Sequence, residues 1–231
     1  MILIDSDILV YKIAFGNEDD TIDYAKKNMD NLIAEILVGV GCDACSYQLY
    51  LTGGGNFRKE LATIQPYKGT RKSEKPKHYQ ALRDYLVGHW NAKVIEGMEA
   101  DDALAMEGTR LGDDAVIVSI DKDLLQVKGR HYNFNTKQMV VIDEFTGMYN
   151  LYHQMLTGDR VDNIRGVQGI GKVKATKLLE DCETEYQMFT AVLEAYDNNL
   201  DELIENARLL YLLRYEDDWW HPPKECKGER S

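Results

Sequence analysis

The sequence has few cysteines, few prolines and no long apolar run. Four cysteines in 231 residues are too few for a disulfide framework, so we expect reduced thiols and a cytoplasmic location. No stretch approaches the roughly 20 apolar residues that a membrane helix needs. Asp5 and Asp7 interrupt the first apolar run, which is unlike a signal peptide. We therefore expect no membrane partner.

The remaining composition is that of an ordinary globular protein. Hydrophobic residues make up 44% and charged residues 29%, which excludes wholesale disorder, collagen and coiled coil. The length fits one large domain or two small ones and is sufficient to bury a core.

The net charge of −12 argues against nucleic-acid binding until its distribution is considered. Residues 58–93 contain nine Lys or Arg and three acids, and residues 160–177 contain five and one. Residues 180–218 contain twelve acids and two Arg. Two basic segments within an acidic chain remain able to bind phosphate.

The hydrophobic pattern predicts an α/β layer followed by helices. The expected elements are strands at 1–5, 46–52 and 115–120, helices at 21–40, 78–90 and from Glu99, a basic loop at 66–78, a hairpin at 130–142, and helices only after about 149. We therefore expect an α/β domain over 1–148 and a helical region over 149–231.

Acidic residues stand where strands end or helices begin. They are Asp5, then Glu99, Asp101 and Asp102, then Asp121 and Asp123, and finally Asp159 and Asp162. The carboxyl ends of parallel strands meet at one edge of a sheet, where gathered carboxylates need cations such as Mg²⁺ or Mn²⁺. Two such ions can catalyse phosphodiester hydrolysis. An isolated pair of this kind is usually a helix start or a turn, but four clusters together favour a metal site.

A glycine-rich turn opens a basic helix at residues 166–179, GVQGIGKVKATKLL. Gly169 and Gly171 allow a close backbone approach, and Lys172, Lys174 and Lys177 supply positive charge. Free amides at the start of the helix can then face a phosphate. The alternative is a tight turn between two helices.

Six motifs in order resemble the 5′-nuclease family of flap endonucleases and 5′→3′ exonucleases, in particular small phage exonucleases and the 5′-nuclease domain of bacterial DNA polymerase I. They are LIDSD (3–7), NFRKEL (56–61), PYKGTR (66–71), EADDA (99–103), VSIDKDL (118–124) and GDRVDNIRGVQGIGK (158–172). The resemblance implies a PIN-like fold, with a mostly parallel central sheet flanked by helices. It also implies a C-terminal helix–three-turn–helix at about 155–180, two divalent metal ions, and a monovalent cation such as K⁺ held by hairpin carbonyls.

The resemblance assigns roles to individual residues. Asp5, Glu99 and Asp101 match the first metal site, with Asp102 in support, and Asp121, Asp123, Asp159 and Asp162 match the second. Lys68 and Arg71 match the catalytic basic pair that contacts the scissile phosphate. The DNA-binding residues are Tyr67, Lys72, Arg165, Gly169, Gly171, Lys172 and Lys174. The Tyr67 ring either stacks near the DNA or packs its own loop.

These assignments predict a monomeric hydrolase that cleaves DNA phosphodiester bonds in duplexes with a 5′ end, a flap or a nick. One alternative is a ribonuclease of the same family that removes RNA primers from RNA–DNA hybrids. The other is a DNA-structure-binding protein whose catalytic site has weakened.

Two departures from the family pattern bear on these alternatives. Gly53 stands where the family usually has a metal-binding Asp, so one first-site carboxylate is missing. The segment from Arg71 to Glu99 is short for the helical arch through which larger relatives thread single strands. Two further patterns have structural interpretations: Cys42 and Cys45 as free thiols, and Trp219–Trp220 as a pair folded onto the core.

Overall fold

The computed structural model describes residues 1–16, 19–41, 46–71 and 74–224. Cys42, Cys45 and Lys72 therefore lie outside the described residues. The chain divides into two compact units. Unit 1 contains Met1–Asn56, Lys72–Ile142 and Leu212–Glu216, and unit 2 contains Phe57–Arg71, Asp143–Tyr211 and Asp217–Ser231.

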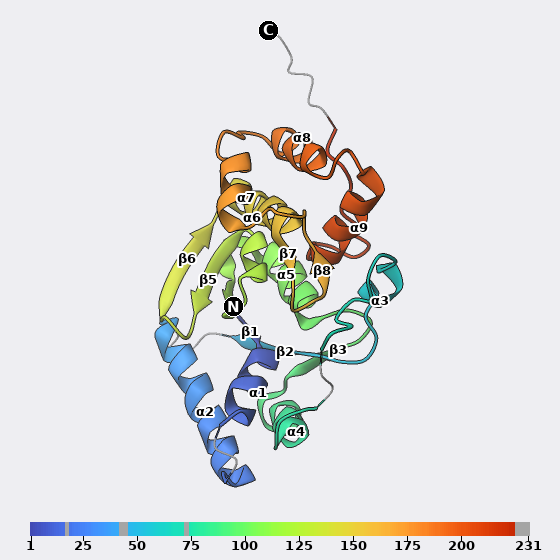
Figure 1. Cartoon of the computed structure of the whole chain (residues 1–231). Helices are drawn as coiled ribbons and strands as arrows, with labels where there is room; N and C mark the ends of the chain where they lie inside the picture. The colour runs from blue at the N-terminus through green and yellow to red at the C-terminus, as the bar shows by residue number, and fades with distance from the viewer. Residues whose placement is uncertain (17–18, 42–45, 72–73, 225–231) are drawn as a thin grey trace. The chain divides into compact units, whose positions relative to one another are not determined.

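Unit 1 is built on a six-stranded sheet with the order β3-β2-β1-β4-β5-β6 (Figure 1). The strands are β1 (Ile2–Asp5), β2 (Tyr47–Thr52), β3 (Lys93–Ile95), β4 (Val116–Val118), β5 (Gly129–Asn133) and β6 (Gln138–Ile142). Neighbouring strands are parallel, except that β6 runs antiparallel to β5. This is the mostly parallel sheet expected from the sequence, and the hairpin at 130–142 is confirmed.

Helices cover both faces of this sheet. Ile2 and Ile4 of β1 pack with α1 (Ser6–Ala14), α2 (Ile22–Gly39) and α4 (Tyr79–Trp90) in one core cluster. Leu3, which points to the opposite face, packs with α5 (Ala100–Leu111) in another. Both faces of β1 are therefore buried, which explains its uninterrupted apolar sequence.

Two elements of unit 1 were not expected from the sequence. Helix α1 begins directly after β1, and the Asp5 side chain caps it by accepting a hydrogen bond from the amide of Ile8. Strand β3 has only three residues and is largely exposed, so it has no clear hydrophobic pattern. Short 3-10 helices cover Gly112–Asp114 and Asp123–Gln126.

Unit 2 is helical with one small ribbon. Its elements are α3 (Arg58–Leu61), α6 (Glu144–Thr157), β7 (Gly158–Asp159), β8 (Ile164–Arg165), α7 (Lys172–Leu179), α8 (Glu185–Ala195) and α9 (Leu200–Leu210). The expectation of helices alone after about 149 is wrong at β7 and β8, which pair antiparallel. Gly158, with a φ of 67°, ends α6 and starts this ribbon, a conformation that few other residues adopt.

Two aromatic residues near the C-terminus complete the core of unit 2. Trp220 is buried against Tyr152 and Phe189, and the Trp219 ring meets the Phe57 ring edge-on at 5.0 Å. The interpretation of this pair as core residues is confirmed for Trp220.

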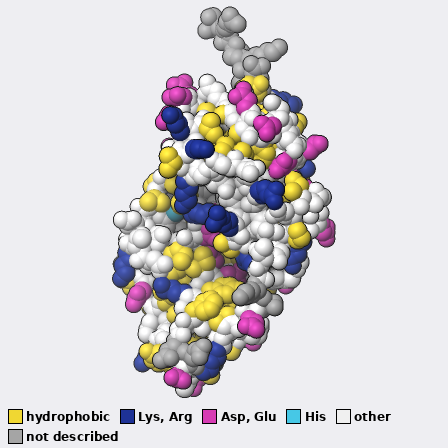
Figure 2. Space-filling model, viewed as in Figure 1, with side chains coloured by type: hydrophobic (Ala, Val, Ile, Leu, Met, Phe, Trp, Pro, Cys, Tyr) yellow, Lys and Arg dark blue, Asp and Glu magenta, His cyan; other side chains and the backbone are white. Residues whose placement is uncertain are grey.

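Some acids of unit 2 have structural partners: Glu205 accepts hydrogen bonds from the amides of Thr63 and Ile64, and Glu185 accepts one from the hydroxyl of Tyr152. Figure 2 shows acidic side chains scattered singly on the viewed face, as expected for solvated helix surfaces. None of the helices in the described part of the chain combines the length and apolar character needed to cross a membrane.

Candidate functional site

The carboxylate of Asp5 lies at the end of β1 and is almost completely buried. Its exposed fraction is 2%, and its Oδ2 accepts a hydrogen bond of 2.7 Å from the hydroxyl of Ser119. The same hydroxyl oxygen accepts a bond of 2.9 Å from the amide of Asp121. Ser119 therefore connects the acids that follow two neighbouring strands, β1 and β4.

Three further acids open helix α5. Glu99 is its N-cap, and the buried Asp102 accepts hydrogen bonds from the amides of Glu99 (3.3 Å) and Leu213 (3.2 Å). Asp102 thus stabilises the backbone around Glu99, consistent with its expected supporting role. The Thr52 hydroxyl at the end of β2 accepts a bond of 2.9 Å from the amide of Ala100, which attaches the start of α5 to the sheet.

The acids of unit 1 disfavour one another's charged forms. Burial raises the pKa of Asp5 to about 7, and the nearby Asp7 and Asp121 contribute to that increase. Burial also raises the pKa of Asp101 well above its usual value, with further contributions from Asp5, Asp121 and Glu99. A bound cation would reverse this effect, because a positive charge stabilises carboxylates that otherwise repel.

This donor set fits a hard divalent cation in its chemistry, since all the candidate ligands are carboxylate oxygens. Within the described ranges, however, no group of three or more His, Cys, Asp or Glu side chains is arranged so that it could hold a metal ion. Mg²⁺ usually keeps several water ligands and needs only one or two carboxylates. The residues of unit 1 therefore remain suitable for such an ion.

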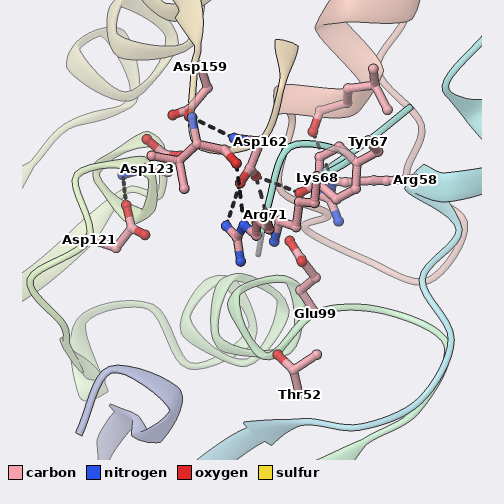
Figure 3. Close-up of polar contacts among 12 residues, drawn as sticks. Thr52, Arg58, Tyr67, Lys68, Arg71, Glu99, Asp121, Asp123, Asp159 and Asp162 are labelled. Atoms are coloured by element: carbon pink, nitrogen blue, oxygen red, sulfur yellow. Dashed lines mark hydrogen bonds and ion pairs between the residues drawn. The ribbon is translucent and has the colours of Figure 1, made fainter. Parts of the chain in front are cut away.

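Two neighbouring acids have structural partners. Asp7 forms an ion pair of 2.6 Å with Arg83 and accepts a bond of 2.8 Å from the amide of Thr52. Asp121 accepts a bond of 2.9 Å from the amide of Asp123, so these two acids share one turn after β4 (Figure 3).

The catalytic basic pair expected from the sequence is attached to Asp162 in unit 2. Oδ1 of Asp162 accepts a bond of 2.6 Å from Arg71, and Oδ2 accepts one of 2.7 Å from the hydroxyl of Tyr67 (Figure 3). The ammonium of Lys68 lies 3.7 Å from the same Oδ2. Asp162, which the resemblance assigns to the second metal site, therefore contacts both cations of the basic pair.

Tyr67 belongs to the core of unit 2. It is only 6% exposed and packs with residues of α6 and α7. The buried ring favours loop packing over stacking near the DNA.

Asp159 shapes the loop that carries Asp162. Its Oδ1 accepts hydrogen bonds from the amides of Val161 (2.7 Å) and Asp162 (3.1 Å). Asp159 therefore has a structural role in the turn of the sequence GDRVDN.

The glycine-rich turn leads into α7 as expected. Gly169 has a φ of 79°, and Gly171 is the N-cap of α7. The ammonium of Lys174 donates a bond of 2.9 Å to the carbonyl of Gly169, so this hairpin carbonyl has a partner from its own chain. Lys172 and Arg165 are exposed and available to a phosphate backbone.

Sequence reasoning did not single out Ser119, Thr52 or Asn163. The side-chain amide of Asn163 donates a bond of 2.9 Å to the carbonyl of Pro66. Ser119 and Asn163 lie within motifs and Thr52 ends a strand, and only their partners in the structure reveal what these small polar side chains do. The position of Asn163 directly after Asp162 is only a weak indication in the sequence that this asparagine belongs to the site.

Comparison with known proteins identified relatives with nuclease names. DNA polymerase I of Bacillus caldotenax is 30% identical over 181 residues, which cover 70% of this chain and 20% of the polymerase. Flap endonuclease Xni of Shewanella piezotolerans is 28% identical, with 68% of each chain covered. A 5′-3′ exonuclease of Mycoplasma genitalium is 27% identical, covering 90% of this chain and 80% of its own. No family model matches the sequence.

This chain spans only part of several relatives. It covers about a fifth of the DNA polymerase I sequences and 52% of the 5′-3′ exonuclease of Mycoplasmopsis pulmonis.

Two solved structures share the fold. The T5 D15 protein co-crystallised with metal ions has a TM-score of 0.69 at 16% identity, with 91% of this chain and 89% of that chain covered. The catalytic core of Rad2 in complex with a DNA substrate has a TM-score of 0.55 at 15% identity, with 86% and 64% covered. The mostly parallel sheet with a helical C-terminal part is therefore the fold of these proteins.

Proposed function

Because this chain is a homologue of the 5′-nucleases and has their fold, we propose that it is a metal-dependent nuclease acting on DNA. The reaction would be hydrolysis of phosphodiester bonds by 5′→3′ exonuclease and flap endonuclease activity. The names of the relatives support this proposal, since they include both activities.

The observation that carries the proposal is the burial of acidic side chains close to one another in unit 1. The buried Asp5 and the half-buried Asp101 have pKa values that are raised by desolvation and by neighbouring acids. Such an arrangement is costly for the fold alone, and it is typical of sites that hold a cation. We assign Asp5, Glu99 and Asp101 to a first divalent ion, with Asp102 in support.

The second set of proposed ligands follows the motif resemblance alone, which assigns Asp121, Asp123, Asp159 and Asp162 to a second ion. When bound, divalent ions such as Mg²⁺ or Mn²⁺ would supply an activated water and stabilise the leaving oxygen.

The chain's own cations act on the phosphate. Lys68 and Arg71 would offset the charge that develops on the phosphoryl oxygens during hydrolysis. Their common partner is Asp162, whose carboxylate contacts both side chains. The guanidinium of Arg71, which is 45% exposed, would donate two parallel hydrogen bonds to a phosphate.

Duplex DNA is the proposed partner of unit 2. Gly169, Gly171, Lys172, Lys174 and Arg165 would contact the phosphate backbone without reading bases. The relatives' structures with DNA support this partner. We further propose that the protein is a monomer, that it is located in the cytoplasm, and that Lys72 makes an additional DNA contact. The cleavage test below shows whether RNA–DNA hybrids are also substrates.

The test is cleavage of 5′-labelled flap, nicked and blunt duplexes, and of an RNA–DNA hybrid, with Mg²⁺, Mn²⁺ or a chelator. We expect metal-dependent products from the flap or the 5′ end. Binding of flap DNA without cleavage at any metal concentration would instead favour the DNA-structure-binding alternative, to which the absence of an acid at Gly53 points.

Matched acidic variants separate the site from general charge effects. Asp101→Asn removes a proposed ligand, whereas Asp84→Asn removes an exposed acid on α4. We expect the first to abolish cleavage and the second to leave it unchanged.

A further inference from the structure

The loop that carries Lys68 and Arg71 contains a tight turn with a strained residue. The amide of Gly69 donates a bond of 2.9 Å to the carbonyl of Pro66, which closes the turn. Lys68 occupies the third position of this turn with a φ of 56°. Glycine or asparagine normally fills that position, because other side chains are rarely tolerated at positive φ. Lys68 therefore keeps this conformation only while its surroundings impose it.

The turn is attached to a loop almost a hundred residues later in the sequence, within unit 2. The amide of Lys68 donates a bond of 2.8 Å to the carbonyl of Asp162, and the side-chain amide of Asn163 donates one of 2.9 Å to the carbonyl of Pro66. Asn163 thus binds the same carbonyl oxygen that closes the turn. Its own φ is 60°, a conformation in which asparagine is enriched.

The ion pairs of Asp162 alone are weak constraints on this loop. The Arg71 side chain is 45% exposed, and the Lys68 ammonium lies 3.7 Å from the carboxylate. The partly exposed Arg71 pair fixes geometry poorly, and the Lys68 pair, at 3.7 Å, is longer than a hydrogen bond. The bond from Asn163 is made by a neutral, short side chain to a backbone atom, so it restrains the backbone of the turn directly.

We propose that Asn163 is a positioning residue that acts through Lys68 and Arg71. It holds the turn at Pro66 and thereby keeps Lys68 in its left-handed conformation, with both cations directed by one rigid loop. The inference rests on the proposed function, in which these two cations act on the phosphate. Because Asn163 is uncharged, its replacement by glycine changes the position of the cations without changing the charge.

The first experiment compares substitutions at two asparagines with the same backbone conformation. Asn163→Gly keeps the freedom to adopt positive φ but removes the amide, and Asn163→Asp keeps the shape but cannot donate a hydrogen bond as a carboxylate. Asn198, exposed and with a φ of 61°, provides the control variants Asn198→Gly and Asn198→Asp. We expect kcat on a flap substrate to fall about 10- to 100-fold for both Asn163 variants, as for a misplaced catalytic group. KM and the melting temperature of each Asn163 variant should change no more than those of the matching Asn198 variant.

A double-mutant cycle tests whether the effect passes through the two cations. Adding Asn163→Gly to a Lys68→Ala, Arg71→Ala background should reduce kcat by less than about twofold, since nothing remains to be positioned. A full multiplicative loss in that background would mean that Asn163 acts elsewhere, and the inference would be overturned.

Amide hydrogen exchange provides a measurement that does not depend on catalysis. The Lys68 amide should exchange faster in Asn163→Gly than in wild type or in Asn198→Gly, because the turn is released from Asp162. Unchanged exchange in an active enzyme would overturn the inference alone. A wild-type chain without nuclease activity would overturn the proposed function and, with it, the catalytic role of Asn163.

Discussion

The carboxyl group of Glu96 fills the space that a side chain at Gly53 would need. A Cβ added to Gly53 would lie 2.7 Å from the carboxyl carbon of Glu96 and 2.7 Å from the carbonyl oxygen of Ile95. Oε2 of Glu96 in turn accepts a bond of 2.6 Å from the amide of Gly54. Gly53 does not have a positive φ, so steric exclusion and not backbone conformation makes this position a glycine. The position that the family resemblance assigns to an Asp is thus closed to any side chain without rearrangement.

We predict that Gly53→Ala lowers the free energy of unfolding by about 1–3 kcal/mol, the usual cost of an overpacked site. Glu96→Ala in the same chain should recover part of this loss, because it removes the flexible neighbour but leaves the Ile95 carbonyl. Urea unfolding of the single and double variants measures both effects. Gly88→Ala, in α4 with open space around it, is the control and should stabilise by up to about 1 kcal/mol. A neutral Gly53→Ala would show that the neighbouring backbone yields easily.

Loss of a proposed second-site ligand should separate binding from catalysis. Asp121→Asn and Asp159→Asn should each reduce Mg²⁺-dependent cleavage by roughly 10³-fold, since metal-ion stabilisation is worth several kcal/mol. Affinity for duplex DNA should stay equal or increase, because a repulsive charge is removed. Single-turnover cleavage and anisotropy binding measure the two quantities. Undiminished cleavage in either variant would refute that ligand assignment.

The raised pKa of Asp5 predicts how the stability of the metal-free protein depends on pH. The folded protein keeps the Asp5 proton up to about pH 7, whereas an unfolded Asp loses it near its ordinary pKa of 3.8. The contribution of Asp5 to stability is therefore complete below the unfolded pKa and is lost as the pH rises through about 7. Asp5→Asn should remove this part of the pH dependence.

The measurement is urea unfolding in chelator between pH 5 and pH 8, compared between wild type and Asp5→Asn. The wild type should lose stability over this range relative to the variant. Mg²⁺ should restore more stability to the wild type at pH 8 than at pH 5, because cation binding competes with protons. If the difference in the free energy of unfolding between the two proteins stays constant from pH 5 to pH 8, the pKa of Asp5 is not raised in the folded protein.

The lysines of α7 should determine part of the salt dependence of DNA binding. Lys172→Ala with Lys174→Ala should weaken duplex binding and reduce the slope of log K against log salt by about 0.9 for each lost phosphate contact. Cleavage at saturating DNA should change little. Lys27→Ala, an exposed lysine on α2, is the control. An unchanged slope in the double variant would place both lysines away from the DNA.

The strained conformation of Lys68 predicts that glycine at this position gives a more stable protein than alanine, the reverse of the usual order of stability. Lys68→Gly should be more stable than Lys68→Ala by about 1 kcal/mol, because only glycine adopts positive φ without cost. Both variants should lose activity to the same extent, since each lacks the ammonium. Thermal unfolding compares them, and an alanine variant as stable as the glycine variant would mean that the turn relaxes.

Local sequence determined the layers of the fold and the places of the acids. Apolar runs such as Ile2–Asp5 and Val116–Val118 indicate strands buried on both faces. Acids at the end of such a run must lie at the end of the strand, because they adjoin it in the chain. Periodicity acts between neighbours in the chain, so it is readable without a structure. Strand β3 was not predicted because, unlike Val116–Val118, its three residues are largely exposed. The β7–β8 ribbon was not predicted because each of its strands has only two residues.

Tertiary structure alone decided which side chains became partners. The bonds from Arg71 and Tyr67 to Asp162, and from Asn163 to Pro66, each join residues more than 85 positions apart. Ser119 joins two strand ends, and Glu96 closes the position beside Gly53, again across distant segments. Such contacts depend on how loops close and elements pack, which local propensity does not encode. The sequence therefore predicted the types of side chain at the candidate site. Only the packing of the chain showed which other residues hold those side chains in place.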